Sequence, residues 1–145
     1  MAFHNGAKPI VGKKMFFCVD PLDPTSYPRS GNTVYDLIGT NNMTRTNAVY
    51  NSNGWFTYDG NDNLKVSTTD FRFSTSFSCG FWFNINAFTN NWFRVIDHWA
   101  SPGNGWGVMR YSSTSKVEWR LDQIDITGDG TFVTGDLSTD TWYYF

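Results

Sequence analysis

The segment SFSCGFWFN (residues 76–84) alternates between apolar side chains and small or polar ones, and it decides the fold. Its apolar members Phe77, Cys79, Phe81 and Phe83 fall on one face of an extended chain, and Trp82 falls on the opposite face. A repeat of two residues, built from aromatic rather than helix-forming residues, predicts a β-strand. A face so apolar needs a second layer to cover it, and we expect the rest of the chain to supply that layer.

The composition indicates one folded domain. Of the 145 residues, 40% are hydrophobic and 19% are aromatic, which is enough apolar surface to offset the entropy of folding. The net charge of −2, with Lys13 and Lys14 as the only adjacent basic pair, provides no positive surface for nucleic acid or an anionic membrane. Residues 1–12 hold no apolar run of signal-peptide length, and no segment approaches the ~20 apolar residues of a membrane helix. We therefore expect synthesis in a cytosol.

Cysteine and histidine are too few for a zinc site. Cys18 and Cys79 both fall within expected strands, where they are either buried free thiols or, if the two strands are neighbours, a disulfide. His4 and His98 are the only histidines. Without a CxxC pair, the chain lacks the four ligands of a structural zinc.

Helical periodicity is almost absent, and short strands separated by turns are expected instead. The expected strands are 15–20, 43–46, 55–58, 64–67, 76–84, 92–99, 105–111, 116–121, 124–133 and 140–145, with a loop at 21–32. Asp59-Gly60 predicts a hairpin between 55–58 and 64–67, because glycine accepts positive φ. The segments 92–99, 105–111 and 116–121 are spaced as an antiparallel meander. Apolar and charged residues alternate strictly at 116–121, with Glu118 expected to point outward. This pattern predicts a sheet with one face exposed to solvent.

These strands predict an all-β fold, a two-sheet antiparallel jelly-roll sandwich with an extended N-terminal arm. A closed barrel is the alternative. The sandwich is favoured because bulky aromatic side chains fill the ~10 Å between two facing sheets. We expect an arm at residues 1–14 and a sandwich domain at residues 15–145.

Five motifs, in this order, carry a family resemblance: FHNG with FCVD (residues 3–6 and 17–20), SYPRSG with YDL (26–31 and 35–37), FTYDGNDNL (56–64), FSCGFWF (77–83) and TWY (141–143). The order resembles the concanavalin A-like, laminin-G/pentraxin-type jelly roll. More narrowly, it is similar to lectin-like modules of structural proteins in tailed bacteriophages. Val34 and Ile38 depart from the usual residues of such modules. A hairpin that usually follows Thr-Trp-Tyr is missing, so we expect either a fragment or strands supplied by a neighbouring subunit.

Catalytic patterns are weak, and we expect no enzyme. Glycosidases on this jelly roll need paired carboxylates on one strand, but Glu118 is the only glutamate. Asp97 and His98 are adjacent, yet no Gly-x-Ser-x-Gly elbow accompanies them.

A calcium site is the expected metal site, if the chain holds one. The resemblance implies Ca²⁺ at the sheet rim, where a hard cation takes oxygen ligands. Asp59, Asn61 and Asp62 crowd one turn and are the candidate ligands. The alternative is that their side chains form Asx turns that fix the hairpin.

Tryptophans beside polar loops are the candidate glycan or interface site. Trp92, Trp99 and Trp106 flank two loops, one of which contains Asn104. Exposed indole rings stack on sugars or mark protein interfaces, whereas buried ones belong to the core.

The resemblance implies a non-enzymatic structural or adhesion protein of a phage virion, made in the host cytoplasm. It would pack against other virion proteins, as a homo-oligomer, through its arm and a sheet edge. A carbohydrate-binding module that recognises host-surface glycans is the alternative function.

Overall fold

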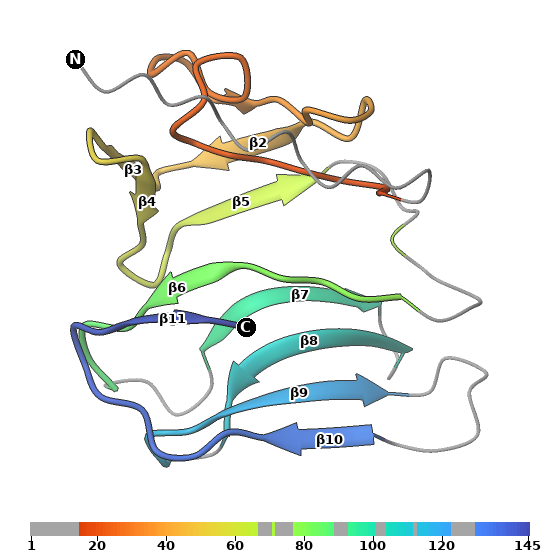
Figure 1. Cartoon of the computed structure of the whole chain (residues 1–145), viewed down its shortest axis with the longest axis vertical. Helices are drawn as coiled ribbons and strands as arrows, with labels where there is room; N and C mark the ends of the chain where they lie inside the picture. The colour runs from red at the N-terminus through yellow and green to blue at the C-terminus, as the bar shows by residue number, and fades with distance from the viewer. Residues whose placement is uncertain are drawn as a thin grey trace. The chain divides into compact units, whose positions relative to one another are not determined.

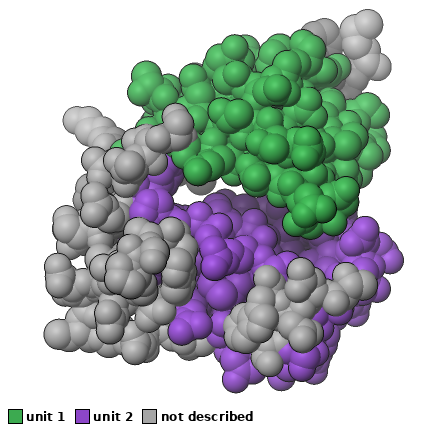
Figure 2. All heavy atoms as spheres, turned by 180° about the vertical axis from the view of Figure 1, so that it is seen from behind, with its two compact units in different colours: residues 1–68 green, residues 69–145 purple. Residues whose placement is uncertain are grey.

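Short antiparallel strands form the regular structure of this protein, seen in a computed structural model (Figure 1). The structure describes residues 15–66, 71, 77–88, 93–100, 104–111, 113–122 and 130–145. These residues contain eleven strands and no helix, which confirms the all-β prediction. The chain divides into two compact units, residues 1–68 and 69–145, which Figure 2 colours separately.

The first unit contains a three-stranded sheet of order β1-β2-β5 and a hairpin of β3 and β4. The bounds are β1 (Thr33–Val34), β2 (Met43–Thr46), β3 (Val49–Asn51), β4 (Trp55–Thr57) and β5 (Asn63–Val66).

The hairpin predicted at Asp59-Gly60 is wrong, because β4 and β5 belong to different sheets. The hairpin instead joins β3 to β4 through a turn at residues 51–54. Gly54 closes this turn with a φ of 100°, and its N–H donates to the Asn51 carbonyl over 2.9 Å. The register places Tyr50 opposite Phe56, and both rings pack around Tyr27. The packing of these three rings stabilises the pairing of β3 with β4.

The strand predicted at residues 15–20 is also wrong. The Cys18 N–H donates to the Asp36 carboxylate over 3.1 Å, and its carbonyl accepts from the Leu37 N–H over 2.8 Å. The Asp36 carboxylate is buried and also accepts the N–H groups of Ile38 and Asn41. The backbone N–H of Cys18 is therefore bonded to a loop carboxylate, where the sequence pattern predicted pairing with another strand.

The second unit contains a four-stranded sheet of order β10-β9-β8-β7 and a two-stranded sheet of β11 and β6. The bounds are β6 (Trp82–Asn84), β7 (Arg94–Ala100), β8 (Asn104–Arg110), β9 (Val117–Asp122), β10 (Gly130–Val133) and β11 (Trp142–Tyr144). All these pairings are antiparallel, and β7, β8 and β9 are consecutive neighbours, which confirms the predicted meander.

The core of the second unit takes side chains from both of its sheets. Phe83 of β6 packs in one cluster with Val108 of β8 and Val117 of β9. The described part of the opening segment alternates as predicted, with Phe81 and Phe83 inward and Ser78, Gly80 and Trp82 exposed. The regular strand is short, but mutual backbone hydrogen bonds between Phe81 and Phe145 extend its ladder.

The prediction that one face of residues 116–121 is exposed to solvent is wrong at Glu118, whose side chain is only 5% exposed. β9 lies between β8 and β10, and the register sets Met109 on one side of Glu118 and Val133 on the other. Two flanking strands therefore shield this carboxylate. Burial raises its pKa, and nearby Arg120 opposes that rise.

The predicted arm, residues 1–14, lies outside the described residues. Within the described part, no helix has the length and apolar character needed to cross a membrane.

Candidate functional site

Among the described side chains of the second unit, the most exposed large aromatic ones lie on the outer face of β6 and β11. Trp82 and Tyr144 are 66% and 65% exposed, and Trp142 is 44% exposed. Because successive strand residues point to opposite sides, these three share the face opposite the core residues Phe83 and Tyr143. We call this surface, formed by Ser78, Gly80, Trp82, Asn84, Trp142 and Tyr144, the β6–β11 aromatic face.

Strand register brings Trp82 and Tyr144 together from distant parts of the sequence. The two residues are direct partners across β6 and β11, and their ring centroids lie 5.2 Å apart with an interplanar angle of 56°. Cross-strand aromatic pairs of this kind stabilise a two-stranded ladder. The two rings are inclined to each other, and both side chains are largely exposed to solvent.

Gly80 provides the space in which the Tyr144 ring lies. A Cβ atom built on Gly80 would sit 2.3 Å from the Tyr144 hydroxyl oxygen and 3.0 Å from Cζ. Real side chains do not approach so closely, so the end of the Tyr144 ring lies against Gly80, two residues before β6 begins at Trp82. The absence of a side chain at residue 80 therefore fixes where Tyr144 can lie.

The polar groups of this face carry no charge. Asn84 lies opposite Trp142 across the two strands, and Ser78 is exposed further along the same side. An amide offers two donors and an acceptor, and a hydroxyl offers both functions. Among its six members, none is acidic or basic.

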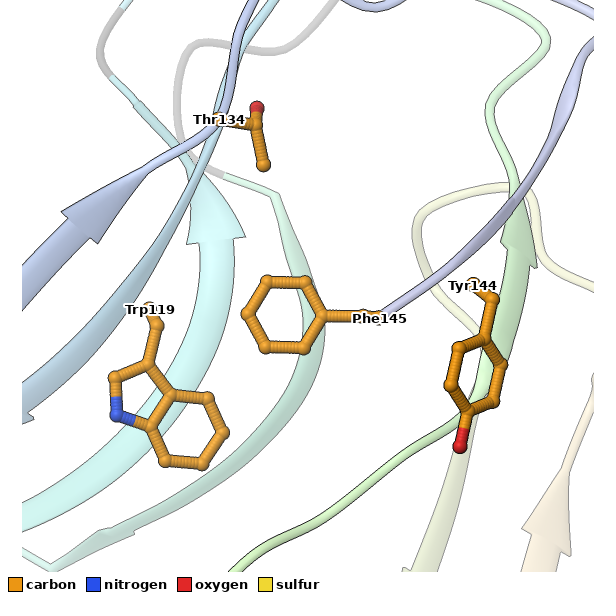
Figure 3. A pocket seen from close by; sticks show the side chains of 4 residues that line it. All are labelled: Trp119, Thr134, Tyr144 and Phe145. Atoms are coloured by element: carbon orange, nitrogen blue, oxygen red, sulfur yellow. The ribbon is translucent and has the colours of Figure 1, made fainter.

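An open cavity of about 480 Å³ lies beside the end of β11 (Figure 3), and it is lined by Trp119, Thr134, Tyr144 and Phe145. The Phe145 ring stacks on Trp119, with centroids 5.8 Å apart and an interplanar angle of 12°. Figure 3 shows Phe145 pointing toward Trp119 and Tyr144 lying on the other side of the chain. The cavity lining is therefore mainly aromatic.

The structure places Trp106, a predicted glycan or interface residue, in the interior. Its side chain is 4% exposed, and its Nε1–H donates to the Phe71 carbonyl over 3.1 Å. The ring stacks on Trp119, so its faces are not available to a ligand, which corrects the exposed interpretation. Trp92 lies outside the described residues, as do the side chains of Trp99 and Asn104.

The predicted calcium ligands lie on an exposed turn and bond to its backbone. Asp62 Oδ2 accepts the Asp59 N–H over 3.0 Å, and Asp59 Oδ1 accepts the Asn61 N–H over 3.2 Å. Gly60 has a φ of 101° in the same turn. These contacts have the geometry of Asx turns. In the described ranges, no three acidic, histidine or cysteine side chains form a metal-binding group. Calcium binding here stays a prediction.

Both cysteines are free thiols. Burial raises the pKa of Cys79 to about 11, and burial also raises that of Cys18, with added repulsion from Asp20 and Asp36. High pKa values keep thiols protonated and weakly nucleophilic at neutral pH. Neither cysteine has the low pKa of a reactive thiol.

The β6–β11 aromatic face was only partly visible in the sequence. Alternation at residues 76–84 predicted that Trp82 points away from the core, but nothing in the sequence paired it with Tyr144. Comparison of the chain with protein-family models, curated proteins and solved structures finds no match.

Proposed function

We propose that this protein is a non-enzymatic structural or adhesion component of a phage virion, folded as a concanavalin A-like two-sheet sandwich. The resemblance of its motifs supports the virion setting. The β6–β11 aromatic face carries the proposal, because exposed Trp and Tyr side chains gathered on one surface are typical of contact sites. Neighbouring virion proteins, or a second copy of the chain, would pack against the arm and the adjoining sheet edge, and this face would provide the adhesive surface.

Edge pairing is a second means of attachment in this proposal. In the described part of the chain β11 pairs with β6 alone, and the cavity beside it is lined mainly by aromatic rings. An outer strand offers backbone N–H and C=O groups to a strand from a neighbour, while side-chain pockets select that neighbour. The proposal does not depend on Ca²⁺ at Asp59, Asn61 and Asp62, because the Asp59 and Asp62 carboxylates already accept backbone N–H groups of their turn.

The test is the location of the native protein. Antibodies raised against the recombinant chain are applied to phage particles purified from the source, and gold labelling is read by electron microscopy. We expect labelling at one regular position on the tail, fibre or capsid. Detection of the protein only in the particle-free lysate would contradict the proposal.

Recognition of host-surface glycans is the second candidate function. It is favoured by the uncharged, partly aromatic character of the β6–β11 face. Trp106 is no longer a candidate because its ring is buried, whereas Trp92, Trp99 and Asn104 stay candidate glycan residues.

A further inference from the structure

We infer that the β6–β11 aromatic face binds a neutral oligosaccharide by stacking pyranose rings on Tyr144 and Trp82, an inference that rests on the proposed adhesion function. The site differs from the loops around residues 90–105 that the sequence indicated. It uses residues from two strands that are far apart in the chain.

Ring geometry is the first support. The C–H groups of a pyranose pack well on the face of an aromatic ring, which is apolar and electron-rich. Tyr144 is 65% exposed although its ring edge rests against Gly80, so its orientation is set while its surface stays open. A ring that is already held loses little conformational freedom when a sugar binds.

Charge is the second support, because it decides between classes of ligand. Nucleic acids and acidic glycans are held by Lys and Arg, and this face has neither. Protein interfaces combine their aromatic residues with Arg and Met, and those are also absent from its six members. A neutral polyhydroxylated ligand fits a surface of aromatic rings, one amide and one hydroxyl.

Polar groups at the two ends of the face would orient a bound oligosaccharide. Asn84 follows Trp82 on this face and Ser78 precedes Gly80, so hydrogen-bonding groups flank the rings along residues 78–84. Binding sites for small polar molecules place a few such groups around an apolar surface to fix orientation. Residues 80–84 span about 13 Å at the usual rise of a strand, the length of a short oligosaccharide rather than one sugar.

The angle between the two rings further restricts the class of oligosaccharide that fits this face. A flat crystalline polysaccharide needs coplanar rings, whereas Trp82 and Tyr144 are inclined by 56°. Two rings inclined in this way suit a soluble chain whose successive sugars are turned relative to one another.

The experiment is affinity electrophoresis of the full chain in native gels that contain one polysaccharide each. The neutral probes are dextran, laminarin and galactomannan, and the anionic probes are heparin and polygalacturonate. We expect at least one neutral probe to retard the wild-type chain, and Trp82→Ala and Tyr144→Ala each to weaken that binding about tenfold.

Gly80→Ala tests the geometry of the site without removing a ring. The added methyl group must displace Tyr144, so we expect it to weaken binding as much as Tyr144→Ala does. In the Tyr144→Ala background, Gly80→Ala should add little further loss, because the two changes act through one ring. Tyr58→Ala is the matched control, since it removes an exposed tyrosine (50%) of the first unit and should leave retardation unchanged. Circular dichroism of each variant confirms that it folds.

Three outcomes would overturn the inference: no retardation by any neutral probe, retardation that the face variants do not change, or an oligomer that Trp82→Ala converts to monomers. The last would make the face a protein interface. Gold labelling of particles is scored separately, so a virion protein that binds no neutral probe disproves this inference alone. A chain that binds such a probe but never labels particles disproves the virion proposal alone.

Discussion

Trp106 of β8 stacks on Trp119 of β9, with ring centroids 5.6 Å apart and an interplanar angle of 19°. The two are diagonal neighbours in the ladder, because Trp106 pairs with Leu121 and Val108 pairs with Trp119. Phe77 contacts both indoles, and Phe145 stacks on the other side of the cluster against Trp119. Four rings from four segments therefore form the aromatic centre of the second unit.

Replacement of Trp106 should strongly destabilise this unit. We expect Trp106→Ala to lower the free energy of unfolding by about 3–5 kcal/mol, because it leaves a cavity and removes a donor to the Phe71 carbonyl. Urea unfolding followed by circular dichroism measures the change. Trp82→Ala is the control, since it removes a tryptophan that is 66% exposed and should cost less than about 1 kcal/mol. Equal losses in the two variants would contradict the assigned burial.

Asp36 should be essential to the loop that replaces the predicted first strand. Its carboxylate accepts three backbone N–H groups, from Cys18, Ile38 and Asn41, at 3.1, 3.0 and 3.3 Å. We expect Asp36→Ala to destabilise the first unit by about 2–3 kcal/mol, the usual value of hydrogen bonds to a charged group. Thermal unfolding measures this loss.

Asp36→Asn separates hydrogen bonding from side-chain volume. Its amide oxygen can still accept from Cys18 and Ile38, but its NH₂ group would face the Asn41 N–H. An intermediate melting temperature is expected, between wild type and Asp36→Ala. If Asn were as stable as Asp, the hydrogen bond from Asn41 would contribute nothing.

The sequence predicts most of the strands and the pairing of β7, β8 and β9, but it misses the other pairings. Period-two alternation indicated which side of residues 77–84 faces the core, because that depends only on neighbouring residues. Pairing depends on contacts between distant segments, so the Asp59-Gly60 hairpin was predicted where β3 and β4 pair instead. Burial of Glu118 also depends on flanking strands. The aromatic face was missed for the same reason, since it requires the register of Trp82 on Tyr144.

Glu118→Gln should stabilise the protein at neutral pH. Burial raises the folded-state pKa of this carboxyl above its ordinary value of 4.5, so its ionised form opposes folding at pH 7. Glutamine has a similar shape and no charge. We therefore expect a higher melting temperature for Glu118→Gln at pH 7 and no gain well below pH 4.5, where the wild-type carboxyl is protonated in both states. A gain of the same size at both pH values would contradict a charge effect.

Calcium removal should leave the turn at residues 59–62 intact. The Asp59 and Asp62 carboxylates already accept backbone N–H groups, so the turn has its own support. We expect the same melting temperature in EDTA and in millimolar Ca²⁺, and a loss of about 1 kcal/mol for Asp62→Ala in both. A rise with Ca²⁺ that disappears in Asp59→Ala would instead establish the predicted metal site.

The Cys79 thiol should make stability fall in alkaline solution. Burial raises its pKa from 9.0 to about 11 in the folded state, so the folded protein binds this proton more tightly than the unfolded chain. The contribution is fully present below pH 9 and is lost as the pH rises toward about 11. Urea unfolding at half-unit pH intervals should show this decline. Cys79→Ala should show a shallower one, because other alkaline groups still titrate.

Alkylation gives an independent measure of the same thiol. Only the thiolate reacts, and a rise from 9.0 to about 11 lowers its fraction about a hundredfold near pH 8. In a Cys18→Ser background, we expect iodoacetamide to modify Cys79 about a hundredfold more slowly in the folded protein than in urea. Folded and unfolded rates that agree would place the thiol in solvent. That result would contradict the inward face assigned to residues 77–83, on which the layered packing of the second unit depends.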